Sequence, residues 1–236
     1  MEDRIAKQRL NVILLVDCST SMRGERISQV NNALRDMQAK LTEMQSENAN
    51  TDFYITVITF STEAFLLNRK EQEAIDQFSF RDIKVGGWSN LHLAYVELEK
   101  LLHKEKRGGI MPDFGGVAPI LLLLTDGHPT KYPLTEEMAA LRALPWFRVA
   151  LKYGIAIELN DKRTMDVLKD FVSGNGDVIE CYDSRLLERI IKIIVLTASK
   201  VKSTSASVHY EKKVSVVQEV KQQVQHALAE VDDWDW

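Results

Sequence analysis

The chain has few cysteines, few prolines and no long apolar run. Only two of its 236 residues are cysteine and five are proline. The cysteines, Cys18 and Cys181, fall in apolar runs or at their ends, so we expect buried, reduced thiols and a cytoplasmic protein. A disulfide framework is therefore excluded, and a chain of this length buries enough apolar surface to fold without one.

Charge and hydropathy exclude two classes of partner. The 30 basic and 34 acidic residues give a net charge of −4 without a strong basic cluster, which argues against nucleic acid. No stretch approaches the ~20 uncharged apolar residues of a membrane helix, because Lys192 interrupts the run 190–198. Residues 1–7 lack the apolar core of a signal peptide, so we expect no membrane partner either.

Short apolar runs alternate with helical periodicities, a pattern typical of a mostly parallel sheet that is covered on both faces. Strands are expected over residues 11–17, 53–60, 120–125, 147–157 and 178–182, with 63–68 as an antiparallel edge strand. Helices are expected over residues 27–44, 90–106, 163–172 and 184–200. The predicted fold class is therefore α/β, with a Rossmann-like, doubly wound, mostly parallel central sheet and helices on both faces.

The composition changes near the end of the chain. Residues 1–201 are expected to form one domain, with a long exposed loop over 104–119. Residues 202–208 are small and polar and read as a linker. Residues 209–236 form an amphipathic tail with an acidic, tryptophan-containing end. A short amphipathic helix cannot bury its apolar face alone, so the tail is expected to dock on its own domain, on a neighbour or on a partner.

Polar side chains follow two of the apolar runs and precede one helical segment. Asp17, Ser19 and Ser21 follow the first run, Ser89 lies just before the helical segment that begins at residue 90, and Asp126 follows the run 120–125. Open α/β sheets bind ligands where their strands end, so these side chains are expected to meet. Oxygen donors without histidine or cysteine favour Mg²⁺, or Mn²⁺, over Zn²⁺.

Two interpretations of the first segment stay open. Asp17, Ser19 and Ser21 can form an ordinary turn that caps the next helix. Alternatively, a divalent cation removes the desolvation cost of a carboxylate at the end of a buried strand. Neutral hydroxyls coordinate such a cation without cancelling its charge, which leaves a position for a carboxylate from outside.

These segments resemble the metal-ion-dependent adhesion site (MIDAS) of von Willebrand factor type A (VWA) domains. Residues ~10–200 follow the strand and helix order of that family. The resemblance implies a VWA fold and a metal held by Asp17, Ser19, Ser21, Ser89 and Asp126. The second position of the motif is normally threonine; Ser89 keeps the ligating oxygen but lacks the methyl group that packs the loop.

A narrower resemblance rests on Val85-Gly86-Gly87 and on residues 124–130. These segments are most like the stand-alone bacterial VWA proteins of the tellurite-resistance type. That resemblance implies a role in a bacterial stress or signalling system, with a kinase-like or phosphatase-like partner. The tail, 209–236, lies outside it.

The sequence favours a non-enzymatic module that binds a partner's Asp or Glu through its metal. An alternative is a Mg²⁺-dependent phosphatase-like hydrolase with Asp17 as nucleophile. That chemistry needs a second acid two residues on, where the chain has Ser19. A further alternative is a scaffold held by its tail independently of metal, or a tail whose Asp232, Asp233 or Asp235 occupies the metal. Trp88 is expected either to contact a partner at the rim of the metal site or to pack half-buried against its own domain.

Overall fold

The computed structural model describes residues 8–47, 51–68, 71–113, 116–158, 161–174, 176–182, 187, 189–194 and 218–227. In chain order the named strands are β1 (Gln8–Asp17), β2 (Thr51–Phe60), β3 (Ala64–Leu66), β4 (Glu73–Ala74), β5 (Ile120–Thr125), β6 (Leu151–Ile157) and β7 (Gly176–Cys181). The named α-helices are α1 (Glu25–Glu47), α2 (Leu91–Leu101), α3 (Thr135–Ala143), α4 (Pro145–Val149) and α5 (Lys162–Val172). Residues 189–194 and 218–227 are also helical.

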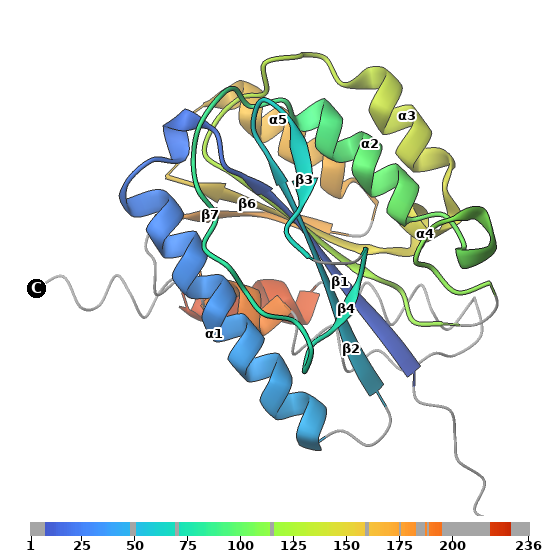
Figure 1. Ribbon diagram of the computed structural model, residues 1–236. Helices are drawn as coiled ribbons and strands as arrows, with labels where there is room; N and C mark the ends of the chain where they lie inside the picture. Colours follow the sequence, from blue (N-terminus) through green and yellow to red (C-terminus); the bar gives the residue numbers. More distant parts are fainter. Residues whose placement is uncertain are drawn as a thin grey trace, which may run out of the picture.

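The strands form one mixed sheet in the order β3-β2-β1-β5-β6-β7 (Figure 1). β2, β1, β5, β6 and β7 are mutually parallel neighbours, whereas β3 and β4 both pair antiparallel with β2. This confirms the mostly parallel sheet with an antiparallel edge, which is built from two short pieces. Because the parallel strands run together, β1, β5 and β6 all end at the same edge.

The central strands are buried on both faces, as expected for parallel strands between helical layers. Every residue of β5 and β6 is buried. Alternate residues of β1 contribute to two separate apolar clusters, one with α1 and one with α2 and α5. Figure 1 shows α1 on one side of the sheet and α2, α3 and α5 on the other. The doubly wound arrangement is thereby confirmed.

Two predicted boundaries were wrong, both near short helices. Residues 147–149 belong to α4, not to the strand, which begins at Leu151. Pro145 explains this, because proline is well suited to the first turn of a helix, where its missing N–H is not needed. The predicted helix 90–106 ends as α2 at Leu101 and is followed by a 3₁₀ turn over Glu105–Arg107. The sequence reasoning also missed α3 and β4.

The described part of the C-terminal tail packs on its own domain. Val220, Val224 and Ala227 are buried in the same cluster as the inner face of α1. Lys221 Nζ lies 3.2 Å from Asp177 Oδ2 on β7. The expected linker 202–208, most of the expected helix 184–200, and the acidic tryptophan-containing end lie outside the described residues. Within the described ranges, no helix is both long and apolar enough to cross a bilayer.

Candidate metal site at the carboxyl edge of the sheet

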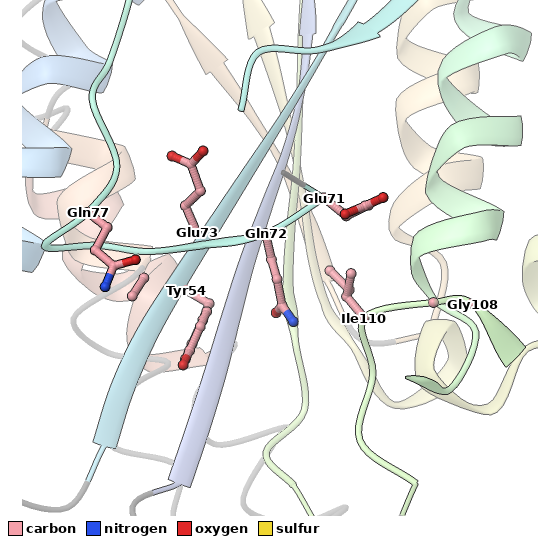
Figure 2. A pocket seen from close by; sticks show the side chains of 9 residues that line it. Tyr54, Glu71, Gln72, Glu73, Gln77, Gly108 and Ile110 are labelled. Carbon is pink, nitrogen blue, oxygen red and sulfur yellow. The ribbon is translucent and has the colours of Figure 1, made fainter. Parts of the chain in front are cut away.

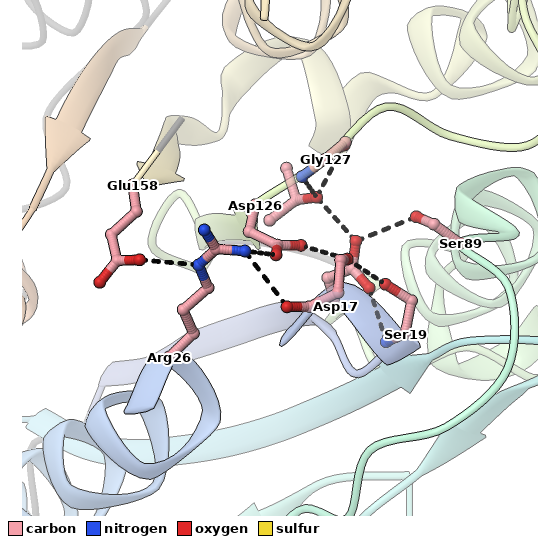
Figure 3. Close-up of polar contacts among 9 residues, drawn as sticks. Asp17, Ser19, Arg26, Ser89, Asp126, Gly127 and Glu158 are labelled. Atoms are coloured by element: carbon pink, nitrogen blue, oxygen red, sulfur yellow. Dashed lines mark hydrogen bonds and ion pairs between the residues drawn. The ribbon is translucent and has the colours of Figure 1, made fainter. Parts of the chain in front are cut away.

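Asp17 is a fully buried carboxylate at the last position of β1. Its Oδ1 accepts a hydrogen bond from the Ser19 backbone N–H at 2.8 Å. Its Oδ2 accepts from Ser89 Oγ at 2.9 Å and from Thr125 Oγ1 at 2.7 Å (Figure 3). Burial raises the pKa of Asp17, and the hydrogen bonds from these three residues oppose that rise.

Two more hydroxyls connect this carboxylate to a second one. Ser19 Oγ lies 3.0 Å from Ser21 Oγ, and Ser21 Oγ donates to Asp126 Oδ1 at 2.8 Å. Ser21 and Asp126 are 105 positions apart in sequence, and Asp17 and Ser89 are 72 apart. The structure therefore brings all five of the predicted residues into one hydrogen-bonded network.

The oxygen atoms of this network lie at hydrogen-bonding separations that the ligands of a small hard cation would also have. An octahedral ion with ligands at roughly 2.0–2.1 Å holds adjacent oxygens about 2.9 Å apart. The three oxygen pairs that join these side chains are 3.0, 2.8 and 2.9 Å apart. The network offers two carboxylates and three serine hydroxyls, without histidine or cysteine. Such an oxygen donor set suits Mg²⁺ or Mn²⁺ and not Zn²⁺.

Backbone contacts hold the loop of Ser89 against the first segment. Thr20 donates to Gly87 O through both its backbone N, at 3.1 Å, and its Oγ1, at 3.0 Å. Gly87 has φ +84°, and a Cβ atom there would lie 2.2 Å from Thr62 Oγ1. The close approach therefore requires glycine at this position. Thr130 N donates to Ser89 O at 2.8 Å, which ties this loop to the one that follows Asp126.

The structure adds two charged residues that sequence reasoning missed. Arg26, in the first turn of α1, donates through Nη1 to Asp126 Oδ2 at 2.7 Å and through Nε to Glu158 Oε2 at 2.8 Å. The hydrogen bond to Glu158 raises the pKa of Arg26, and the charge of Asp126 raises it further. A signal for Glu158 was available, because it directly follows a buried strand, as Asp126 does. Arg26 had no comparable signal.

Two other residues near the site lie at its rim. Trp88 is 70% exposed, which identifies it as a surface side chain and not as half-buried packing. His128 is also exposed, and its Nδ1 lies 3.9 Å from Asp161 Oδ2. Asp161 in turn caps α5 by accepting from Thr164 N.

A separate hollow lies toward the opposite end of the sheet. It has a volume of ≈ 730 Å³ and is lined by residues that include Tyr54, Glu71, Gln72, Glu73 and Ile110 (Figure 2). Tyr54 is in the first half of β2, whereas the strand partner of Asp17 is Phe60, at the other end of that strand. This hollow is therefore distinct from the oxygen network.

The chain matches a known family over most of its length. A family model described as von Willebrand factor type A domain matches residues 11–192. The chain is also 26% identical over 132 residues to inter-alpha-trypsin inhibitor heavy chain H1 of Sus scrofa. That match covers 54% of this chain and 14% of the relative, so the chain corresponds to only a small part of it.

Solved structures support the same fold. A von Willebrand factor type A protein from Catenulispora acidiphila has a TM-score of 0.61 and 15% identity, covering 81% of this chain and 43% of the other. Proximal thread matrix protein 1 from the mussel byssus has a TM-score of 0.55 and 18% identity, covering 82% and 48%. At these identities the similarity establishes the fold alone.

Proposed function

The chain belongs to the von Willebrand factor type A family, whose domains are protein-interaction modules, and on that premise we propose that it binds a protein partner through a divalent cation. Asp17, Ser19, Ser21, Ser89 and Asp126 would hold the cation, which would be Mg²⁺ or Mn²⁺. The partner would supply an Asp or Glu carboxylate. We thus propose that these five residues form a metal-ion-dependent adhesion site.

One observation carries this proposal. Five oxygen-bearing side chains, drawn from three distant segments of the chain, form one network at the carboxyl edge of the sheet. An isolated turn that only caps a helix would need neither Ser89 nor Asp126. The hydrogen bonds bring oxygen donors from all three segments together, as a shared ligand requires.

The charges of the network suit the capture of a third carboxylate. Asp17 and Asp126 supply two negative charges, while the serine hydroxyls are neutral donors of electron pairs. The two aspartates would balance the charge of a divalent cation bound there. The cation would still offer an electrophilic coordination position. Asp17 is fully buried, so solvent screens its attraction for a bound cation only weakly. A partner's carboxylate can therefore complete the coordination.

The proposal includes no catalysis. Asp17 would be the nucleophile of the phosphatase-like alternative, and that chemistry also needs a general acid to protonate the leaving group. The residue two positions on, Ser19, cannot protonate a leaving group near neutral pH. An assay with Mg²⁺ and a generic phosphate ester tests this directly. Turnover that disappears in Asp17→Asn would contradict the proposal.

We further place the protein among the tellurite-resistance-type VWA proteins, in a bacterial stress or signalling system. Val85-Gly86-Gly87 and residues 124–130 support this placement. The partner would then be kinase-like or phosphatase-like. A cytoplasmic location belongs to the same proposal, and the two free, buried cysteines support it.

Affinity capture from the native cell tests the proposed function. Wild-type protein should retain a partner in Mg²⁺ and release it on addition of EDTA. Asp17→Asn should capture none, because its neutral amide cannot balance the cation. Asp36→Asn is the matched control: Asp36 is an exposed residue of α1, and its loss removes the same charge. Equal capture by wild type and Asp17→Asn, or capture insensitive to EDTA, would refute metal-dependent binding.

A further inference from the structure

Arg26 connects the oxygen network to a carboxylate outside it. Nη1 of Arg26 donates to Asp126 Oδ2 at 2.7 Å and to the backbone oxygen of Ser21 at 3.2 Å. Nε of the same guanidinium donates to Glu158 Oε2 at 2.8 Å (Figure 3). Both Ser21 and Asp126 belong to the network, so the charge of Arg26 lies directly beside it.

The position of Arg26 is not favoured by its own helix. It is the second residue of α1, where the partial positive charge of the helix N-terminus opposes a cation. Its side chain is only 32% exposed, so solvent screens that charge in part. The two carboxylates of Asp126 and Glu158 therefore hold the guanidinium at this position.

Glu158 shows a second unusual feature. It has φ +47°, and in the described ranges it is the only residue other than glycine with a positive φ. A side chain is held in this backbone region only when its surroundings fix it, and such residues concentrate at functional sites. The backbone N–H of Glu158 donates to Cys181 O at 2.8 Å, which ties the end of β6 to the end of β7. The backbone of Glu158 is thus fixed, and its carboxylate holds Arg26 from the side away from the network (Figure 3).

The charge of the site depends on this pair. Asp17, Asp126 and Glu158 contribute three negative charges and Arg26 one positive charge, so the set carries −2. A divalent cation brings that set to neutrality. If Arg26 were absent, the set would carry −3, and the cation would be held more strongly and would attract a further carboxylate less.

We propose that Arg26 limits the affinity of the site for its divalent cation, with Glu158 positioning the guanidinium against Asp126. This inference rests on the proposed function, since it concerns the same metal. Arg26 acts as a resident positive charge that shares Asp126 with the bound ion. Without a partner, the site therefore holds the metal weakly. A partner's carboxylate adds negative charge and increases the affinity for the metal, so the metal and the partner each strengthen the binding of the other.

The geometry leaves part of the guanidinium available to that partner. In the described part of the chain Nη2 of Arg26 has no hydrogen-bond acceptor, and Figure 3 shows this nitrogen without a dashed line. Arginine binds carboxylates strongly through its terminal nitrogens. Nη2 of Arg26 therefore offers a hydrogen-bond donor to a partner's carboxylate.

Calorimetric titration with Mn²⁺ alone tests the inference without a partner. A unit charge a few ångströms from a divalent ion alters its affinity by on the order of tenfold, even with water-like screening. Arg26→Gln is therefore expected to bind Mn²⁺ about tenfold more tightly than wild type. Arg26→Met keeps the aliphatic stem and serves as a second neutral variant, with the same expected gain. Circular dichroism checks that each variant is folded.

Two controls separate local charge from other effects. Arg26→Lys keeps the charge and should stay within about threefold of wild type. Arg23→Gln removes an exposed charge from the neighbouring turn and should change Mn²⁺ affinity by less than about twofold. If the wild type binds Mn²⁺ and both neutral variants bind it with unchanged or weaker affinity, this inference is overturned and the proposed function stands. A wild-type protein that binds no Mn²⁺ would overturn both.

Discussion

Thr125 Oγ1 donates a hydrogen bond of 2.7 Å to Asp17 Oδ2, across the boundary between two neighbouring parallel strands. Asp17 ends β1 and Thr125 ends β5, and both side chains are buried. The bond fixes the carboxylate orientation in which its other contacts, to Ser19 and Ser89, are made. Thr125 is thus a positioning residue for the site, although it is not among the expected metal ligands.

Removal of that hydroxyl should weaken both the fold and the site. Thr125→Val keeps the shape of the side chain but leaves Asp17 Oδ2 without its shortest hydrogen bond. We expect the free energy of unfolding to fall by about 2 kcal/mol and Mn²⁺ affinity to fall as well. Urea unfolding and calorimetry measure these effects. Thr125→Ser, which retains the hydroxyl, should lose much less of the Mn²⁺ affinity; equal Mn²⁺ binding by the two variants would contradict the assigned role.

The buried charge of Asp17 predicts a particular pH dependence in EDTA. Burial raises the pKa of Asp17 above its ordinary value of 3.8, so the folded chain holds this proton more tightly than the unfolded chain does. The stabilising contribution of protonated Asp17 is complete below about pH 3.8 and is lost as the pH rises through the raised pKa. Asp17→Asn, which stays neutral, should therefore be at least as stable as wild type at pH 7 in EDTA.

Thermal unfolding from pH 4 to pH 8 follows this difference. Wild-type protein in EDTA should lose stability relative to Asp17→Asn as the pH rises. In Mg²⁺ the order should reverse at pH 7, because only the wild type can bind the ion. An Asp17→Asn variant that is less stable than wild type in EDTA across the whole range would show that ionised Asp17 stabilises the fold instead.

Gly87 provides a matched pair of loop substitutions. Gly87→Ala combines a positive φ with a Cβ only 2.2 Å from Thr62 Oγ1, whereas a Cβ at Gly86 meets nothing within 4 Å. We expect Gly87→Ala to lower the free energy of unfolding by about 1–3 kcal/mol and to weaken Mn²⁺ binding by displacing Ser89. Gly86→Ala should do neither. Urea unfolding and calorimetry of the pair decide the matter, and equal behaviour of the two variants would count against the loop's role.

The tail helix should contribute to the stability of the whole domain. Val224 is 3% exposed within the core cluster shared with α1. Val224→Ala removes two buried carbon atoms and should cost about 2 kcal/mol in the free energy of unfolding. Gln225→Ala, on the exposed side of the same helix, is the control. If urea unfolding shows no difference between the two variants, the tail does not support the domain.

Much of the fold follows from hydropathy patterns that the chain shows clearly. The runs 12–16 and 120–125 are apolar throughout, so their places as central parallel strands could be predicted. The spacing of Ile27, Val30, Leu34, Met37 and Leu41 likewise predicted a helix buried along one face, and all five are buried in α1. Such long, regular patterns depend on local sequence alone.

The missed elements lack that regularity. α4 has five residues, and its Phe147 and Val149 have the β propensity of the strand that follows. β4 has only two residues, and its pairing with β2 depends on the chain returning to that edge. Neither element is determined by local sequence alone.

The site shows the same division. Asp17, Ser19, Ser21 and Asp126 could be singled out because they lie at or just after strand ends that the sequence marks, and the resemblance to the family motif added Ser89. Arg26 could not be singled out, because a charged residue in the first turn of an exposed helix face is ordinary in sequence. Only the position of the first turn of α1 beside the ends of β5 and β6 brings it to Asp126 and Glu158.

The most direct test of a shared cation is a crystal structure of the protein soaked in MnCl₂, with anomalous scattering to locate the manganese. The account predicts one strong peak among Asp17, Ser19, Ser21, Ser89 and Asp126, about 2.2 Å from the nearest side-chain oxygens. Well-ordered side chains at these positions without an anomalous peak, or a peak only elsewhere on the protein, would contradict it.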